Sequence, residues 1–189
     1  MRKLKLTDLL VTIMIGIAFG IIMKFWDDFY SVVKPILPTA RQLLYGMWFM
    51  VAPFAFLLIR KPGVALLASI AAAGLSAFIG HGVQVLIYGA VQGLAAELIF
   101  AAFRYKRYNI AVAGIAGVMS CLGSFLLDLY YGYADLEAWA LTVKYSLRAI
   151  SAFIFTGIFA YYIVKALEAT KVTSLIRPVA KEEYDQLNR

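Results

Sequence analysis

Glu97 is the residue of this sequence with the clearest potential for chemistry, because it lies inside a long apolar run. It follows Gln92-Gly93-Leu94-Ala95-Ala96 and is well separated from the charged segments on either side. A carboxylate in a lipid-embedded run is costly and usually faces a cavity, a ligand or a charged partner. The sequence therefore predicts a ligand or transport site at Glu97. The alternative is a buried ion pair with Lys144 or Arg148.

Polar side chains also recur every four residues ahead of Glu97, at Gln84, Tyr88 and Gln92. This spacing places them on one stripe of a helix. Such a stripe either lines a polar cavity or forms hydrogen bonds between helices. Glu97 lies about 140° around the helix from Gln92. One narrow face therefore cannot hold all four side chains, and either the helix lies between two polar regions or one set is structural.

Further charged residues lie at the end of the next apolar run, at Asp128, and within the run after it, at Lys144 and Arg148. Asp128 is predicted either to close the rim of a site or to be an ordinary carboxylate at the membrane interface. Lys144 and Arg148 are four residues apart and share a helix face. They either bind an anion or neutralise Glu97 or Asp128.

Aromatic residues gather near the ends of the apolar runs, where Trp26, Trp48, Tyr131 and Trp139 are the candidates for ligand contact. Amphipathic rings at such positions are typical of the aromatic belt of a membrane protein. Acidic residues, including Asp27, accompany them. A cage that stacks on a flat or cationic ligand is therefore the second interpretation.

Enzymatic chemistry has little support in the residue types present. One cysteine, Cys121, and one histidine, His81, leave no ligand set for zinc. The sequence has no glycine-rich P-loop for ATP hydrolysis. We therefore expect no catalytic residues, no metal, no cofactor and no enzymatic activity.

The elements that must position these residues are membrane helices. The chain has 189 residues, of which 63% are hydrophobic and 15% charged, whereas soluble domains have about 45–50% and about 25%. Runs of roughly 17–25 apolar residues suit helices that cross the bilayer. The sequence predicts an all-α bundle of six transmembrane helices at Leu6–Met23, Leu43–Ile59, Val64–Ile79, Val83–Phe103, Ile110–Leu127 and Leu141–Val164.

The basic residues predict the orientation of this bundle. With the N-terminus inside, 13 of the 18 lysines and arginines lie on the cytoplasmic side, as the positive-inside rule requires. We expect a multi-pass protein of the plasma membrane with both termini cytoplasmic. Residues 1–170 form the transmembrane domain and 171–189 a short cytoplasmic tail. Lys24–Gln42 is predicted as a long outer loop.

The segment Val91-Gln92-Gly93-Leu94-Ala95-Ala96-Glu97-Leu98, followed by Arg104-Tyr105-Lys106-Arg107, resembles a known family. It is similar to the substrate-binding S components of energy-coupling-factor (ECF) vitamin transporters, in the YkoE-like branch. Members of that branch take up thiamine or its hydroxymethylpyrimidine precursor. The resemblance implies partners, namely a transmembrane T component and ATPase subunits that use ATP.

The resemblance also implies roles for individual residues. A small-residue face on the first helix would dock the T component, here through Gly16, Ala18 and Gly20. Glu97 would accept a hydrogen bond from the aminopyrimidine. Asp27 or Asp128 would offset a thiazolium charge. The full set of implied ligand-binding residues is Glu97, Gln92, Tyr88, Trp26, Asp27, Trp48, Asp128, Tyr131 and Trp139.

Two other functions are compatible with the residues. One is a stand-alone secondary transporter of a small organic solute, coupled to protons through Glu97. The other is a purely structural membrane subunit.

Overall fold

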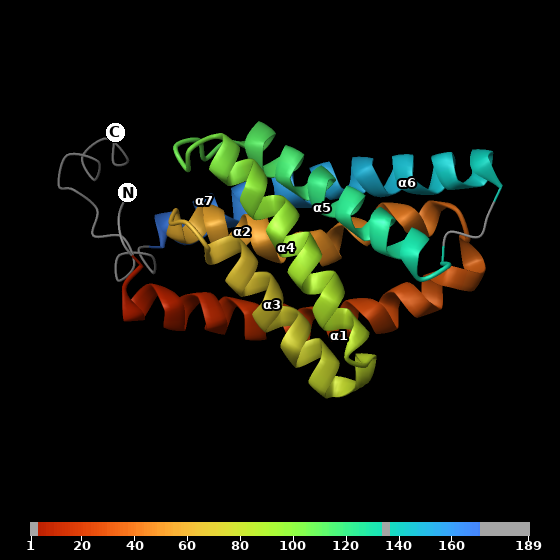
Figure 1. The fold of residues 1–189 in the computed structure, drawn as a ribbon, viewed down its shortest axis with the longest axis horizontal. Helices are drawn as coiled ribbons and strands as arrows, with labels where there is room; N and C mark the ends of the chain where they lie inside the picture. Colours follow the sequence, from red (N-terminus) through yellow and green to blue (C-terminus); the bar gives the residue numbers. More distant parts are fainter. Residues whose placement is uncertain (1–3, 134–136, 171–189) are drawn as a thin grey trace.

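The computed structural model describes residues 4–133 and 137–170, and in this part of the chain six helical spans are long and apolar enough to cross a membrane. The predicted six-helix membrane bundle is confirmed (Figure 1). Several spans are composite, because short 3₁₀ or π segments continue the α-helices. The elements are α1 (Leu6–Ile36), η1 (Ala40–Phe49) with α2 (Val51–Ile59), α3 (Val64–Ser76) with η2 (Ala77–His81), α4 (Gln84–Ala102), α5 (Ile110–Tyr130), and α6 (Ala138–Phe153) with η3 (Ile154–Phe159) and α7 (Ala160–Ala169).

The first residues of α1 and the last residues of α7 lie at the same end of the bundle, which we call the terminal end (Figure 1). The α2–α3 and α4–α5 turns lie there too. Arg60, in the α2–α3 turn, pairs with Glu168 of α7 at 3.0 Å. The opposite end, where α1 meets η1 and where α5 finishes, is called the far end. Which side of the membrane each end faces stays a prediction from the basic residues, and the predicted tail at 171–189 lies outside the described residues.

The predicted outer loop at Lys24–Gln42 is wrong, because α1 continues as a helix to Ile36. Its extra turns are held by local interactions, including an ion pair between Lys24 and Asp28 at 2.8 Å, one helical turn apart. Pro35 has no backbone N–H to continue the helical hydrogen bonds, and α1 ends one residue later. A helix of 31 residues is roughly 46 Å long, which exceeds the bilayer core of about 30 Å.

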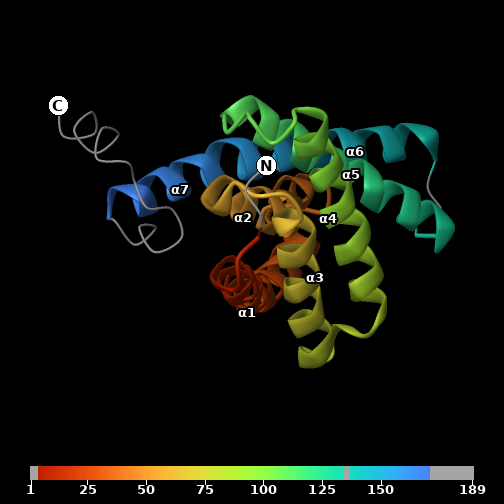
Figure 2. The same cartoon turned by 60° about the vertical axis from the view of Figure 1, so that its left-hand side comes forward.

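The centre of the bundle is α2, whose nine residues are all buried. Figure 2 shows it surrounded by the other helices. The Phe56 ring of α2 stacks on Phe100 of α4 with 3.8 Å between ring centroids. The other spans bury a smaller share of their residues and leave the remaining apolar side chains for lipid.

The family resemblance predicts that Gly16 and Gly20 dock a partner, and the structure places both of them inside the bundle. Both are buried against α3. A Cβ atom on Gly16 would lie 2.5 Å from the Cβ of Ala71, and one on Gly20 would lie 2.9 Å from Leu75 Cδ2. The glycines therefore permit close helix packing inside the bundle. Of the three predicted docking residues, only Ala18 is exposed.

Gly46 fixes the approach of η1 to α6. Its backbone N–H donates to the Ser151 hydroxyl at 2.8 Å, and Ser151 in turn donates to the Leu43 carbonyl at 2.5 Å. A Cβ on Gly46 would collide with the backbone carbonyl of Ser151. Since η1 leads into the buried α2, this contact helps to set the position of the central helix.

We expect Gly46→Ala to lower the stability by about 1–3 kcal/mol, as overpacking does in well-packed cores. The measurement is the melting temperature of the purified protein in detergent. Gly74→Ala is the matched control, because its nearest heavy atom would be an ordinary contact, Leu86 Cδ2 at 3.9 Å. Equal melting temperatures for the two variants would contradict the tight contact between η1 and α6.

Candidate ligand-binding site

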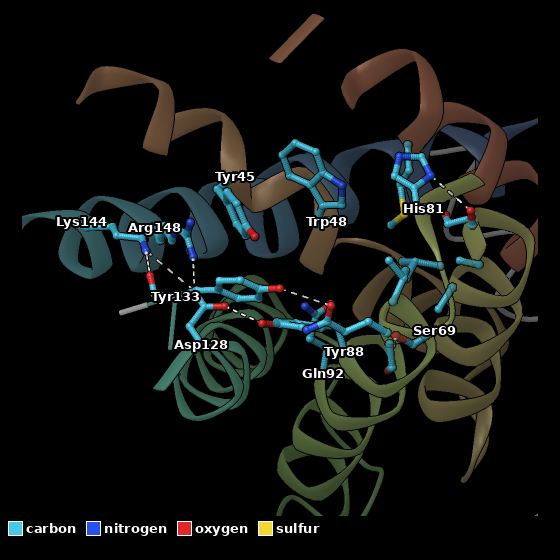
Figure 3. A pocket seen from close by; sticks show the side chains of 18 residues that line it. Tyr45, Trp48, Ser69, His81, Tyr88, Gln92, Asp128, Tyr133, Lys144 and Arg148 are labelled. Carbon is cyan, nitrogen blue, oxygen red and sulfur yellow. Dashed lines mark hydrogen bonds and ion pairs between the residues drawn. The ribbon is translucent and has the colours of Figure 1, made fainter. Parts of the chain in front are cut away.

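A cavity of about 410 Å³ opens between η1, α3, α4, α5 and α6. This volume lies in the range of small-molecule sites, which span roughly 300–1,000 Å³. Figure 3 shows that polar and aromatic side chains from several elements point into it. The labelled lining residues are Tyr45, Trp48, Ser69, His81, Tyr88, Gln92, Asp128, Tyr133, Lys144 and Arg148.

Asp128 is the centre of the hydrogen-bond network at one end of the cavity. Its Oδ1 accepts from the Tyr88 hydroxyl at 2.7 Å. Its Oδ2 accepts from the Tyr145 hydroxyl at 2.5 Å and from Arg148 Nη1 at 3.1 Å. Lys144 Nζ lies 3.8 Å from the same oxygen. Of the alternatives left open by the sequence, neutralisation of Asp128 by Lys144 and Arg148 is the one observed.

Arg148 connects this network to η1. Its Nε donates to Gln42 Oε1 at 2.7 Å, and its guanidinium lies 3.6 Å from the ring centroid of Tyr45. Arg148 and Asp128 expose only 7% and 8% of their side chains. A buried charge is tolerated when it is paired and hydrogen-bonded, and each of these partners supplies part of that compensation.

Sequence reasoning missed Gln42, Tyr45 and Tyr145. Their only signal in the sequence was the interruption of apolar stretches by polar or phenolic side chains. That pattern does not reveal which helix each side chain faces.

The polar stripe of α4 forms another wall of the cavity. Gln84, Tyr88 and Gln92 all line it, and they also make hydrogen bonds between helices. Gln92 Nε2 donates to the Ser124 hydroxyl of α5 at 2.6 Å, and the Tyr133 hydroxyl donates to Gln84 Oε1 at 3.4 Å. The two readings of the stripe, cavity wall and interhelical contact, are therefore both observed.

His81 closes the cavity beside α1. Its Nε2 lies 3.0 Å from Asp27 Oδ2 and its Nδ1 lies 3.1 Å from the Ser76 carbonyl. This contact joins α1 to the segment between α3 and α4. Asp27 therefore contacts a residue of the cavity wall, His81, but does not itself line the cavity.

Comparison with known proteins identifies the family. The model of the protein family described as "ABC-type cobalt transport system, permease component" matches residues 7–123. The putative HMP/thiamine permease protein YkoE of Bacillus subtilis is 34% identical over 176 residues, which are 91% of this chain and 88% of the relative. A crystal structure of an S component of an ECF transporter matches with a TM-score of 0.89 at 31% identity, over 98% of this chain and 95% of that chain.

This chain belongs to the S components of ECF transporters. The resemblance to the YkoE-like branch is thereby confirmed, as is the expectation of a membrane transport subunit without enzymatic activity.

The structure of this S component brings together Trp48, Tyr88, Gln92 and Asp128 around the cavity. It places the other predicted aromatic residues elsewhere. Trp26 Nε1 donates to the Leu44 carbonyl at 3.0 Å, which ties α1 to η1. Tyr131 stacks behind Tyr88, with 6.1 Å between ring centroids.

Trp139 is 69% exposed, and its Nε1 donates to Glu137 Oε2 at 2.6 Å. Such an exposed indole fits the aromatic belt better than a ligand cage.

Glu97 also lies outside the cavity wall. Its carboxylate accepts from the backbone N–H groups of Gly63 at 2.6 Å, Ala65 at 3.0 Å and Leu66 at 3.3 Å. These donors belong to the start of α3, where N–H groups have no partner within the helix and the helix dipole favours a negative charge. The alternative considered for Glu97, an ion pair with Lys144 or Arg148, is not observed, because both cations pair with Asp128.

The surroundings of Glu97 belong to the terminal end of this S component. Burial, together with the nearby Glu97 carboxylate, raises the pKa of the Tyr105 phenol in the α4–α5 turn to about 12. A buried ion pair between Lys61 and Asp8 attaches the α2–α3 turn to α1. Glu97 therefore contributes to fastening helices together. Its predicted ligand role stays a prediction, and its position does not favour it.

We expect Glu97→Ala to destabilise the protein by about 0.5–2 kcal/mol, the usual effect of removing a helix cap. Glu97→Gln keeps one acceptor oxygen and should fall between this variant and the parent. Melting temperatures in detergent measure both effects. An unchanged melting temperature combined with a loss of thiamine binding would show that Glu97 acts on the ligand instead.

Proposed function

We propose that this S component binds a thiamine-type compound, either thiamine or its hydroxymethylpyrimidine precursor, in the cavity between η1 and α3–α6. The carrying observation is the cavity itself, whose wall combines aromatic rings with a few convergent polar groups, as small-molecule sites do. The relative from Bacillus subtilis bears the name of a permease for the same compounds. The S component would act in ATP-driven import, with a T component and ATPase subunits as partners.

The lining residues suit a flat, hydrogen-bonding heterocycle. Tyr45 and Trp48 of η1 and Tyr88 of α4 supply ring faces, which favour offset stacking or edge contacts with another aromatic ring. Gln84 offers both a donor and an acceptor in its amide. An aminopyrimidine presents donors and acceptors around one edge, so these groups can hold it in a single orientation.

The proposed orientation follows from the basic residues. With both termini cytoplasmic, the far end of the bundle faces outward and ligand enters from outside the cell. The plasma membrane is then the site of action. A stand-alone proton-coupled transporter is less well supported, because Glu97 lies away from the cavity and its carboxylate is hydrogen-bonded to backbone N–H groups.

Tryptophan fluorescence tests the ligand and the cavity together. Of the three tryptophans, Trp48 lines the cavity, whereas Trp26 and Trp139 do not. We expect thiamine or hydroxymethylpyrimidine to quench the fluorescence saturably, and we expect Trp48→Phe to remove most of this change. Trp139→Phe is the matched control and should retain it. Absence of saturable quenching by either compound, in protein that melts cooperatively, would contradict the proposed ligand.

The partner assignment makes a separate prediction. Ala18 is exposed on α1, while its neighbours Gly16 and Gly20 face α3. We expect a T component and ATPase subunits to co-purify with the parent protein, and Ala18→Trp to reduce their yield severalfold without lowering the melting temperature. Leu126→Trp, at a 65% exposed position of α5, is the control. Equal yields for the two variants would exclude Ala18 from the docking face.

A further inference from the structure

The wall of the proposed ligand cavity carries more positive than negative charge. Lys144 and Arg148 both line the cavity, and Asp128 is the single carboxylate among the described lining residues. Figure 3 shows the three side chains together at one end, with His81 and Ser69 at the other. Asp128 is already engaged by Tyr88, Tyr145 and Arg148. It is therefore poorly placed to pair with a cationic ligand, and the wall retains a net positive charge.

A third positive charge, that of Arg41, adds to the positive potential of the cavity wall. Arg41 of η1 lies close enough to Lys144 to interact with it electrostatically. Within the described part of the chain, the buried Nε of Arg41 has no hydrogen-bond partner. Lys144 and Arg148 of α6 share one carboxylate, Asp128 of α5, and the guanidinium of Arg41 lies over the Tyr30 ring, 5.7 Å from its centroid. Like charges brought together in a poorly solvated site repel each other, and an anion bound between them would relieve that repulsion.

Lys144 is the cation best placed to contact such an anion. Arg148 is fixed by Gln42 and Asp128 and by the ring of Tyr45. The polar contacts of Lys144 are long, at 3.8 Å to Asp128 Oδ2 and 3.5 Å to the Tyr133 carbonyl, and its Nζ lies 5.0 Å from the ring centroid of Tyr145. Its side chain remains 16% exposed. Its ammonium group can therefore turn toward a ligand at little cost.

We propose that, among thiamine-type compounds, this site prefers those that carry a phosphate ester, and that Lys144 determines this preference. The proposal rests on the proposed function. A phosphate monoester has a charge of about −1.5 to −2 near pH 7 and several acceptor oxygens, which match Lys144 and the field of Arg148 and Arg41. The thiazolium of unesterified thiamine instead adds a positive charge to a wall that already has an excess.

Paired titrations of the full-length protein in detergent test the preference. Thiamine and thiamine monophosphate are titrated separately, with tryptophan fluorescence as the signal. We expect the ester to bind at least tenfold more tightly, and the ratio of the two affinities to fall toward one in Lys144→Gln. Lys34→Gln, at an exposed position of α1, removes the same charge away from the cavity and should keep the ratio. Lys144→Arg keeps the positive charge and should largely preserve the ratio of the two affinities.

The outcomes separate this inference from the proposed function. Binding of thiamine with no preference for the ester, or a preference that survives in Lys144→Gln, would overturn the role of the cations and leave the proposed function standing. Failure of thiamine and its monophosphate to bind folded parent protein would overturn this inference, and failure of hydroxymethylpyrimidine as well would overturn the proposed function.

Two further measurements need no variant at Lys144. The ester preference of the parent should shrink as ionic strength rises, because salt screens partly exposed charges, and an unchanged preference would count against the proposal. Inorganic phosphate alone should compete only weakly. Competition as strong as that of the ester would show an adventitious anion site in place of ligand recognition.

Discussion

The contact between Asp128 and Arg148 is the interaction on which the far end of the molecule depends. It joins α5 to α6, and the other partners of the two residues bring in Tyr88 of α4 and Gln42 and Tyr45 of η1. A buried charge left without a partner is severely destabilising, so these elements cannot move apart independently. The cavity exists where they meet. The same pair that holds its wall together also sets the charge that a ligand encounters.

A second set of polar contacts joins the helices at the terminal end. Glu97 caps α3, Lys61 pairs with Asp8 of α1, and Arg60 pairs with Glu168 of α7. The helix α4 connects the two ends, with its Gln84–Gln92 stripe on the cavity and Glu97 near the opposite turn. In a lipid environment the apolar faces of helices gain little by meeting each other. Polar contacts and close glycine packing therefore decide how this bundle is assembled.

The proposed transport function rests on the difference between the far end, which holds the cavity, and the terminal end, where polar contacts join the helices. The far end supplies aromatic rings, amides and an excess of positive charge around a cavity of ligand size. Membership of the S components explains why the chain needs no catalytic machinery of its own. Gly16 and Gly20 pack α1 against α3, whereas Ala18, the docking residue in the proposed assembly, is exposed.

The sequence alone determined the membrane location, the six spans and the polar stripe of α4, because apolar length and helical periodicity are local properties of the chain. Four of the residues that it predicts to bind a ligand, Trp48, Tyr88, Gln92 and Asp128, line the cavity. The sequence did not reveal that Glu97 contacts the start of α3 or that Gly16 and Gly20 pack against α3, and it missed Gln42 and Tyr45. A carboxylate in an apolar run looks the same whether it meets a ligand or the N–H groups at the start of a neighbouring helix. Only the tertiary structure decided which, because the partners of Glu97 lie more than 30 residues away along the chain.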